Sequence, residues 1–339
     1  MDSIQVSGNP FTRIRPAVWI TALVWICAIG LAVVLGNEYG LFDRPSSEGQ
    51  SVPEQIMAHQ FAAIEALFVI ALVMWMTRKR PKIDATAIGI SRDDAMYVLR
   101  IGVVYGIIAI LGGYALGTAM DTYAFSFHLP GTLIGTHSHN MVSQSQAIAW
   151  SLYNLIAWVI VPLWYVRKRF PGGRSFWRSN NLRADIILIG TVLAIESVVQ
   201  IFALSDSLLG LSAKQVVLGM PLSFVIYLLG TGLPTMVFLQ IVIVPRLLVV
   251  TNSFAISVVL GGVAYTLVHL PESWMTFTSP SQTLLSIIFL FFTYFFPGMV
   301  KVVMTLRTGN AWVHMWAYHA IAPHVIVDTA LIVAIFAIR

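Results

Sequence analysis

The chain has 339 residues, of which 58% are hydrophobic and only 10% carry a charge, whereas soluble domains carry roughly 25% charged residues. Long apolar runs recur along the whole chain, and because backbone groups inside lipid must bond to one another, such runs predict membrane-spanning helices. An ordinary soluble domain is therefore excluded, and we expect an all-α, polytopic transmembrane helix bundle. The single cysteine, Cys27, excludes an internal disulfide and a cysteine-rich metal site.

Windows of about 20 apolar residues predict nine spans, within a range of eight to ten. The predicted spans cover residues 17–36, 56–76, 97–117, 147–166, 186–204, 216–244, 254–270, 284–303 and 311–338. The sixth run is too long for one straight helix and contains Pro221, Gly230 and Pro234. It is therefore either one kinked helix or two short ones.

Basic residues predict the orientation of these spans. Arg13 and Arg15 precede the first span, and basic clusters at 78–82 and 167–183 follow the second and the fourth. Because cytoplasmic loops are enriched in Lys and Arg, we expect a multi-pass integral protein with a cytoplasmic N-terminus, in the plasma membrane of a prokaryote. The same rule explains the net charge of +5, so no nucleic-acid partner is expected. The first run is interpreted as an anchor rather than a signal peptide.

Ionisable residues inside predicted spans cost about 2.5–3.5 kcal/mol each, so each is a candidate for function. The candidates are Glu65, Glu196, His269, His314, His319, His324 and Asp328. Tyr265 and His269 are four residues apart and share one helical face, directly after the small pair Gly261 and Gly262. The alternative for His269 is a structural hydrogen bond between helices.

The last span is the richest in polar residues. At 100° per residue, His324 and Asp328 share a face while His319 points away, unless Pro323 bends the helix. A zinc ion is a cofactor to consider only if His269, His319 and His324 meet from separate helices. His128, together with residues 137–139, is predicted to lie in an outward loop. Surface histidines of this kind usually have no special role, and a metal site there is the lesser alternative.

Two segments resemble motifs of the CPBP family, the CAAX-type proteases and bacteriocin-processing or self-immunity proteins. Residues 263–274, VAYTLVHLPESW, resemble its second motif, an aromatic residue followed four positions later by histidine, here Tyr265 and His269. Residues 307–320, RTGNAWVHMWAYHA, are similar to the approach to its third motif. His319 is the natural counterpart, but its fourth neighbour is Pro323.

The pair His324 and Asp328 has the spacing of the third motif instead. Residues 85–106 look like the family's interfacial segment, so the resemblance covers 85–339 and leaves 1–84 as N-terminal anchor spans. The family's first motif is Glu-Glu-x-x-x-Arg, but GLPTMVFLQIVIVPRLL has Thr235, Met236 and Gln240 at those positions.

The resemblance implies an intramembrane endopeptidase in which a glutamate activates water and histidines hold the water and the oxyanion. Here His269 and His319 are the implied catalytic histidines, Glu196 is the replacement base, and the pair His324–Asp328 is the alternative third motif. Tyr265, Thr235 and Gln240 are expected to bind the substrate, a membrane-embedded or lipidated peptide or protein.

Two other interpretations stay open. An inactive family member would bind a peptide, a lipidated protein or a toxin, and a membrane transporter would use broken helices around a central site. A carboxylate within one water of His269 separates the peptidase from the inactive binder.

Overall fold

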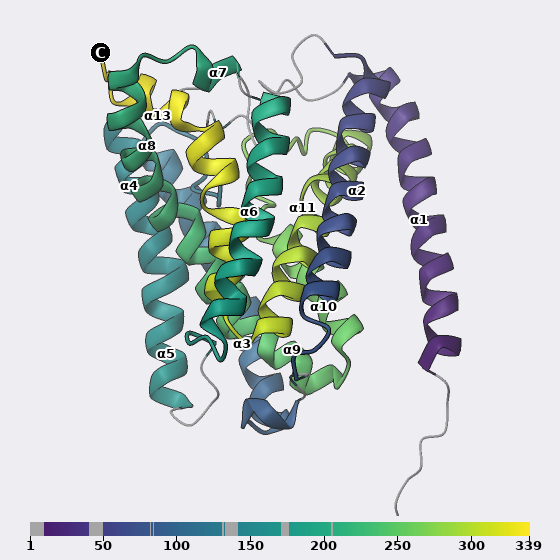
Figure 1. Cartoon of the computed structure of the whole chain (residues 1–339). Helices are drawn as coiled ribbons and strands as arrows, with labels where there is room; N and C mark the ends of the chain where they lie inside the picture. Colours follow the sequence, from purple (N-terminus) through teal and green to yellow (C-terminus); the bar gives the residue numbers. More distant parts are fainter. Residues whose placement is uncertain are drawn as a thin grey trace, which may run out of the picture.

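The computed structural model describes residues 10–40, 50–81, 83, 85–130, 132, 142–170, 176–204 and 206–339, and within these ranges it contains helices and no β-strand. Figure 1 shows the longer helices running side by side as a bundle, with α1 at its edge. The prediction of an all-α polytopic bundle is confirmed.

The bounds of the elements follow the chain. The first half contains α1 (Pro10–Tyr39), α2 (Val52–Met76), the 3-10 turn η2 (Thr86–Ile88), α3 (Arg92–Ala119), α4 (Gln144–Leu155), the π-helical η3 (Ile156–Ile160) and α5 (Val161–Arg169). The second half contains α6 (Leu182–Leu204), α7 (Asp206–Leu209), α8 (Ala213–Tyr227), η4 (Leu228–Gly232), η5 (Thr235–Ile243), α9 (Val244–Thr251), α10 (Phe254–Leu267), α11 (Pro280–Thr308), α12 (Ala311–His314), η6 (Met315–His319), η7 (Ala322–Val327) and α13 (Thr329–Ile335). Of these, η4, η5, η6 and η7 are π-helical.

Seven helices in the described ranges are long and apolar enough to cross a membrane. They are Trp19–Tyr39, Val52–Met76, Arg92–Ala119, Gln144–Arg169, Leu182–Ile201, Ala213–Thr251 and Pro280–Thr308. The final pair, Ala311–Val327 and Thr329–Ile335, bends by 50° and forms an eighth passage when counted as one. The predicted count of nine is therefore slightly too high.

The long sixth run is one continuous helix, Ala213–Thr251, of 39 residues. Pro221 lies inside α8, and the chain continues from α8 through the π-helical turns η4 and η5 into α9. Since a π-helix has a wider turn than an α-helix, it absorbs the irregularity around Gly230 and Pro234 without ending the helix. The interpretation as a single kinked helix, rather than two short spans, is correct.

The seventh run, residues 254–270, does not make a full span. α10 has 14 residues, about 21 Å at 1.5 Å per residue, against a hydrocarbon core of about 30 Å. The helix ends at Leu267, and tight turns follow in which the Glu272 amide donates to the His269 carbonyl at 3.1 Å. Pro271 disfavours helical geometry at the residue before it, which explains why the helix does not continue.

Close helix packing positions residues 263–274, the segment that resembles the second motif of the family. α10 and α11 lie against each other, and a Cβ added at Gly262 would come within 2.8 Å of Met299. One added at Gly298 would come within 2.8 Å of the Tyr265 Cβ. Only glycine permits this approach, so the small residues bring Tyr265 and the following turn against α11.

One end of the bundle carries the predicted cytoplasmic basic residues. Arg80, after α2, pairs with Asp185 of α6 at 2.5 Å, and Asn310 donates to the other oxygen of Asp185 at 3.0 Å. Arg307, near the end of α11, donates from Nε to the Thr77 hydroxyl at 2.9 Å. Figure 1 places the end of α5 at this same end. These basic loops therefore share one face, and its assignment to the cytoplasm stays a prediction.

Candidate functional site

His128 lies in the segment between α3 and α4, and it is buried, with 4% of its surface exposed. Trp150 Nε1 and Asn154 Nδ2 of α4 both donate to the Ser126 carbonyl at 2.8 Å, and the Ser126 hydroxyl donates to the His128 carbonyl at 2.8 Å. Because these bonds satisfy the backbone inside the bundle, the segment can hold a polar side chain there. The prediction that His128 is an exposed loop residue is wrong, and residues 137–139 lie outside the described residues.

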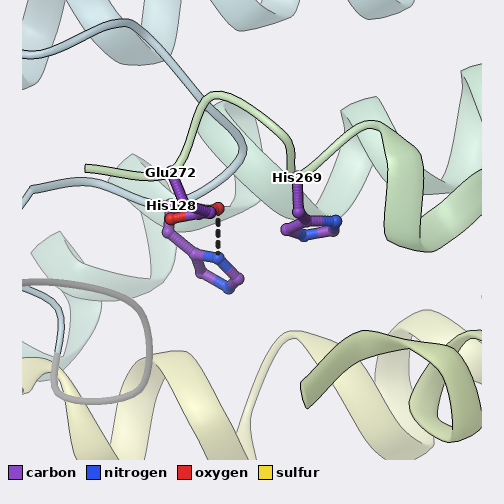
Figure 2. A group of neighbouring side chains, drawn as sticks. All are labelled: His128, His269 and Glu272. Carbon is purple, nitrogen blue, oxygen red and sulfur yellow. Dashed lines mark hydrogen bonds and ion pairs between the residues drawn. The ribbon is translucent and has the colours of Figure 1, made fainter. Parts of the chain in front are cut away.

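His269 and Glu272 come from the turn after α10. His269 Nδ1 lies 2.6 Å from the Tyr265 carbonyl, to which it must donate because a carbonyl only accepts. Glu272 Oε1 lies 2.9 Å from His128 Nδ1. Figure 2 shows the His128 imidazole directly below the Glu272 carboxylate and the His269 imidazole to the right of both.

His128, His269 and Glu272 form a compact group that could hold a metal ion. One ligand atom from each lies within 4.8 Å of those of the other two, and all three side chains are buried. Tyr294 of α11 stacks on His269, with ring centroids 3.9 Å apart, and its hydroxyl lies 3.2 Å from His128 Nδ1. The His128 ring is thus held by Glu272 and by the Tyr294 hydroxyl, and the His269 ring by the Tyr265 carbonyl and by the Tyr294 ring.

The last helices contribute a row of histidines. In η6 and η7 the backbone bonds run from residue i+5 to residue i, as from the Ala320 amide to the Met315 carbonyl at 2.8 Å. Residues five apart then lie nearly above one another. The rings of His314 and His319 are 6.2 Å apart, and those of His319 and His324 are 5.3 Å apart. The expectation that His319 points away from His324 assumed α-helical geometry, and it fails because the helix is π-helical here.

His324 is the most firmly oriented member of the row. Its Nδ1 lies 3.1 Å from Asp328 Oδ2, Tyr227 of α8 stacks on its ring at 4.7 Å, and its carbonyl accepts from the Ser223 hydroxyl at 2.8 Å. The His324 ring also lies 5.5 Å from that of His128. The histidines of the last helices thereby adjoin the group around Glu272.

Several of these ring nitrogens have no hydrogen-bond partner among the residues that the structure describes. They are Nε2 of His269, His314 and His324 and both nitrogens of His319. A buried polar atom left unpaired costs about 1–3 kcal/mol. Such atoms in a cluster indicate that a water molecule, an ion or a substrate completes the site.

A cavity of about 550 Å³ adjoins the histidines. Its walls come from α2, α6, α11 and the last helices, and His128, His319 and His324 line its inner end, together with Tyr265 and Tyr294. His269, Glu272 and Asp328 are not among its lining residues and lie behind this wall. Phe61 of α2 also lines the cavity and is 64% exposed, so the cavity opens toward the outer surface of a membrane-length helix.

A second group of charged residues lines the same cavity. Glu65 comes from α2, Glu196 from α6 and Lys301 from α11. The Lys301 ammonium lies 4.1 Å from the ring centroid of Tyr265, a cation–π contact. Oε1 of each carboxylate is buried and has no hydrogen-bond partner among the described residues.

The structure brings together most of the site residues expected from the sequence. Tyr265, His319, His324 and Glu196 line one cavity, and His269 and Asp328 lie directly behind its wall. Thr235 and Gln240 are fully buried in η5 and are not among the lining residues.

Sequence reasoning missed two residues, His128 and Glu272. Glu272 had a usable signal, since it is a carboxylate only three residues after His269 in an apolar stretch. It is the carboxylate placed beside His269 in the structure. His128 had none, because its burial depends on the hydrogen bonds that hold its loop against α4.

Comparison with family models, with curated proteins and with solved structures gives no match. The likeness to the CPBP family therefore rests on the sequence motifs alone and stays a prediction.

Proposed function

We propose that this protein is an intramembrane hydrolase that cleaves a membrane-embedded or lipidated peptide, with His324 as the general base. The observation that carries the proposal is the pair His324–Asp328 at the inner end of the cavity. The activity is of the peptidase class that the resemblance implies, but the base is a histidine rather than a glutamate of the first motif.

The pair is built for proton transfer. Because Asp328 accepts a bond from Nδ1, His324 carries its proton there and presents the lone pair of Nε2, which has no partner among the described residues. Nε2 takes a proton from a water molecule while the water oxygen attacks the scissile carbonyl carbon. As the C–N bond breaks, His324 returns that proton to the leaving nitrogen, and one water is consumed per bond.

The negative charge that develops on the carbonyl oxygen needs a donor. His319 lines the cavity 5.3 Å from His324, ring to ring, and a neutral imidazole always has one N–H to donate. In a site with little water, such a donor stabilises an oxyanion strongly. His319 therefore keeps the role that the resemblance implies for it.

Glu196 is not needed as the base in this proposal. It shares the cavity with His324 and Lys301, and its Oε1 is buried with no hydrogen-bond partner among the described residues. His324 is held by a hydrogen bond and by a stacked ring, and a general base must be held within hydrogen-bond reach of the proton that it removes.

The cavity fits a hydrophobic substrate that arrives from the lipid. Its mouth at Phe61 lies on a helix whose outer surface would face acyl chains. We propose that the protein lies in the plasma membrane with the basic end of the bundle in the cytoplasm. The mouth, lined by the first half of α2 from Gln55 to Glu65, then opens in the outer half of the bilayer.

The test uses the full-length protein in liposomes together with a panel of single-span and lipidated peptides, with the products read by mass spectrometry. We expect cleavage by the wild type, loss of cleavage in His324→Ala, and cleavage by Glu196→Gln. Equal cleavage by wild type and His324→Ala would refute the role of His324. Peptide binding without cleavage in the wild type would favour the inactive-binder interpretation.

A further inference from the structure

We propose that a zinc ion is bound by His128, His269 and Glu272. This rests on the proposed function, because the ion would activate the same water and the same carbonyl group. The three residues come from two segments, the loop between α3 and α4 and the turn after α10. The sequence offered His269 as a possible zinc ligand, but together with His319 and His324 rather than with His128 and Glu272.

The histidines are prepared as metal ligands. A ligating imidazole usually donates its other N–H to a carboxylate or a backbone carbonyl, which fixes the tautomer and the ring. His269 makes this bond to the Tyr265 carbonyl at 2.6 Å, and its Nε2 is buried without a partner among the described residues. Figure 2 shows the His269 imidazole beside that of His128.

Burial and charge favour a divalent cation at this point. The exposed fractions of His128, His269 and Glu272 are 4%, 0% and 2%. Two neutral imidazoles and one carboxylate balance part of a double positive charge, and Asp328, bonded to the neighbouring His324, adds a second carboxylate close by. Without an ion, Nε2 of His269 is buried with no hydrogen-bond partner among the described residues.

The type and the number of ligands indicate zinc. Imidazole and carboxylate ligands suit Zn²⁺, and three protein ligands with one open position are typical of catalytic rather than structural zinc sites. Two histidines and one carboxylate also bind Fe²⁺ in oxygenases. The proposed reaction changes no oxidation state, which favours zinc over iron.

The position of the group connects it with His324. His128 is the member of the group that also lines the cavity, and its ring lies 5.5 Å from that of His324. A metal ion lowers the pKa of a bound water toward about 7 and polarises a carbonyl oxygen. His324 would then remove a proton from a water molecule that the bound ion has made more acidic.

The experiment measures the metal and does not require activity. The full-length protein is purified in detergent from zinc-supplemented cells, and its metals are quantified by mass spectrometry. We expect about one zinc per chain in the wild type, and at least a tenfold loss in His269→Gln and in Glu272→Gln, because even residues that only support a ligand change metal affinity by about 10–100-fold.

His314→Gln is the matched control. Like His269, His314 is fully buried, and its Nδ1 donates to a backbone carbonyl, that of Ala311, at 2.6 Å. It is not a member of the three-residue group, so its substitution should leave the zinc content unchanged. Iron instead of zinc, a wild type with less than a tenth of an equivalent, or equal zinc in His269→Gln and His314→Gln would overturn the proposal.

A second measurement distinguishes absence of the metal site from misfolding of a variant and from failure of the proposed function. The metal-free wild type is titrated with Co²⁺, whose visible absorption reports a four-coordinate site of nitrogen and oxygen ligands. His324→Ala should give the same absorption while cleavage is lost. If no peptide is ever cleaved but the absorption appears, the metal site stands and the proposed function falls. Absence of the absorption in the wild type overturns the metal site whatever the cleavage result.

Discussion

Two groups of polar residues line or adjoin one cavity inside the bundle, and they are built differently. In the first, His128, His269 and His324 each have a partner for Nδ1: Glu272, the Tyr265 carbonyl and Asp328, respectively. In the second, Glu65 and Glu196 each have a buried oxygen with no hydrogen-bond partner among the described residues. One group is oriented by its neighbours, and the other is only enclosed.

Side chains that are oriented by hydrogen bonds can catalyse the cleavage of a bond, whereas side chains without such bonds can adjust to a bound ligand. Catalysis needs side chains held close to the productive geometry, and hydrogen bonds supply that order before the substrate arrives. Glu65 and Glu196, whose Oε1 atoms have no hydrogen-bond partner among the described residues, are less restricted in orientation. We therefore assign proton transfer to the first group and, at most, a modest influence on substrate binding to the second.

The largest effect is expected from the base of the oriented group. His324→Ala should lower the cleavage rate by about 100- to 10,000-fold, because loss of a general base has that cost. Initial rates in liposomes measure it. Asp328→Asn should follow in the same direction, because the amide lacks the negative charge and can turn its N–H toward Nδ1, which selects the other tautomer of His324. A loss of less than threefold in both variants would break the distinction between the two groups.

Glu272→Gln should lower the rate by about 10- to 100-fold, the cost of removing a residue that orients a histidine or holds an ion. Glutamine keeps the size of the side chain but cannot carry the charge that pairs with His128. The rate in this variant is compared at low and at saturating zinc. If saturating zinc restores the rate, Glu272 acts as a ligand of the ion. If the rate in the variant equals that of the wild type, Glu272 belongs with Glu65 and Glu196, which each have a buried oxygen but take no part in cleavage.

Gly230→Ala tests the packing around Trp150, which holds the His128 loop against α4. A Cβ at this position would lie 2.1 Å from the Trp150 ring, which with Asn154 holds the loop of His128. Overpacking of this kind costs about 1–3 kcal/mol, so thermal unfolding in detergent should begin at a lower temperature. Gly190→Ala is the control, since a Cβ there meets nothing within 4 Å. Equal stability of both variants would contradict the tight packing around Trp150.

The smallest effect is expected from Glu196→Gln, which should change the rate by less than about threefold, far below the 100-fold or more of a lost general base. The substitution preserves shape and leaves His324 with its partners. Full kinetics over a range of peptide concentrations measure it. A large fall in kcat with unchanged KM would show that Glu196 is the base after all and would reverse the comparison.

Prediction from sequence succeeded where one residue property repeats along a helix. Apolar runs located the membrane-length helices, and proline and glycine marked the long kinked helix that the structure shows as Ala213–Thr251. It failed where helix geometry itself changes. The rule of 100° per residue placed His319 away from His324, but π-helical turns align residues five apart.

The candidate site was predictable only in part. His269, His319 and His324 stood out because ionisable residues are costly in apolar runs, and the structure places them in one region. His128 did not, since a histidine in a loop has no periodicity to show whether it is buried. Thr235 and Gln240 were expected in the site from an alignment with a family motif, and they lie buried in η5 and are not among the residues that line the cavity.

The amino-acid sequence by itself determined that this chain is a helical bundle for a membrane, because hydrophobicity and backbone hydrogen bonding are local properties that every apolar run carries with it. Only the tertiary structure decided that His128 and Glu272 meet, 144 residues apart in the chain. Their contact depends on how a short helix ends and on how a loop packs against α4, and such contacts leave no pattern in the chain before it folds.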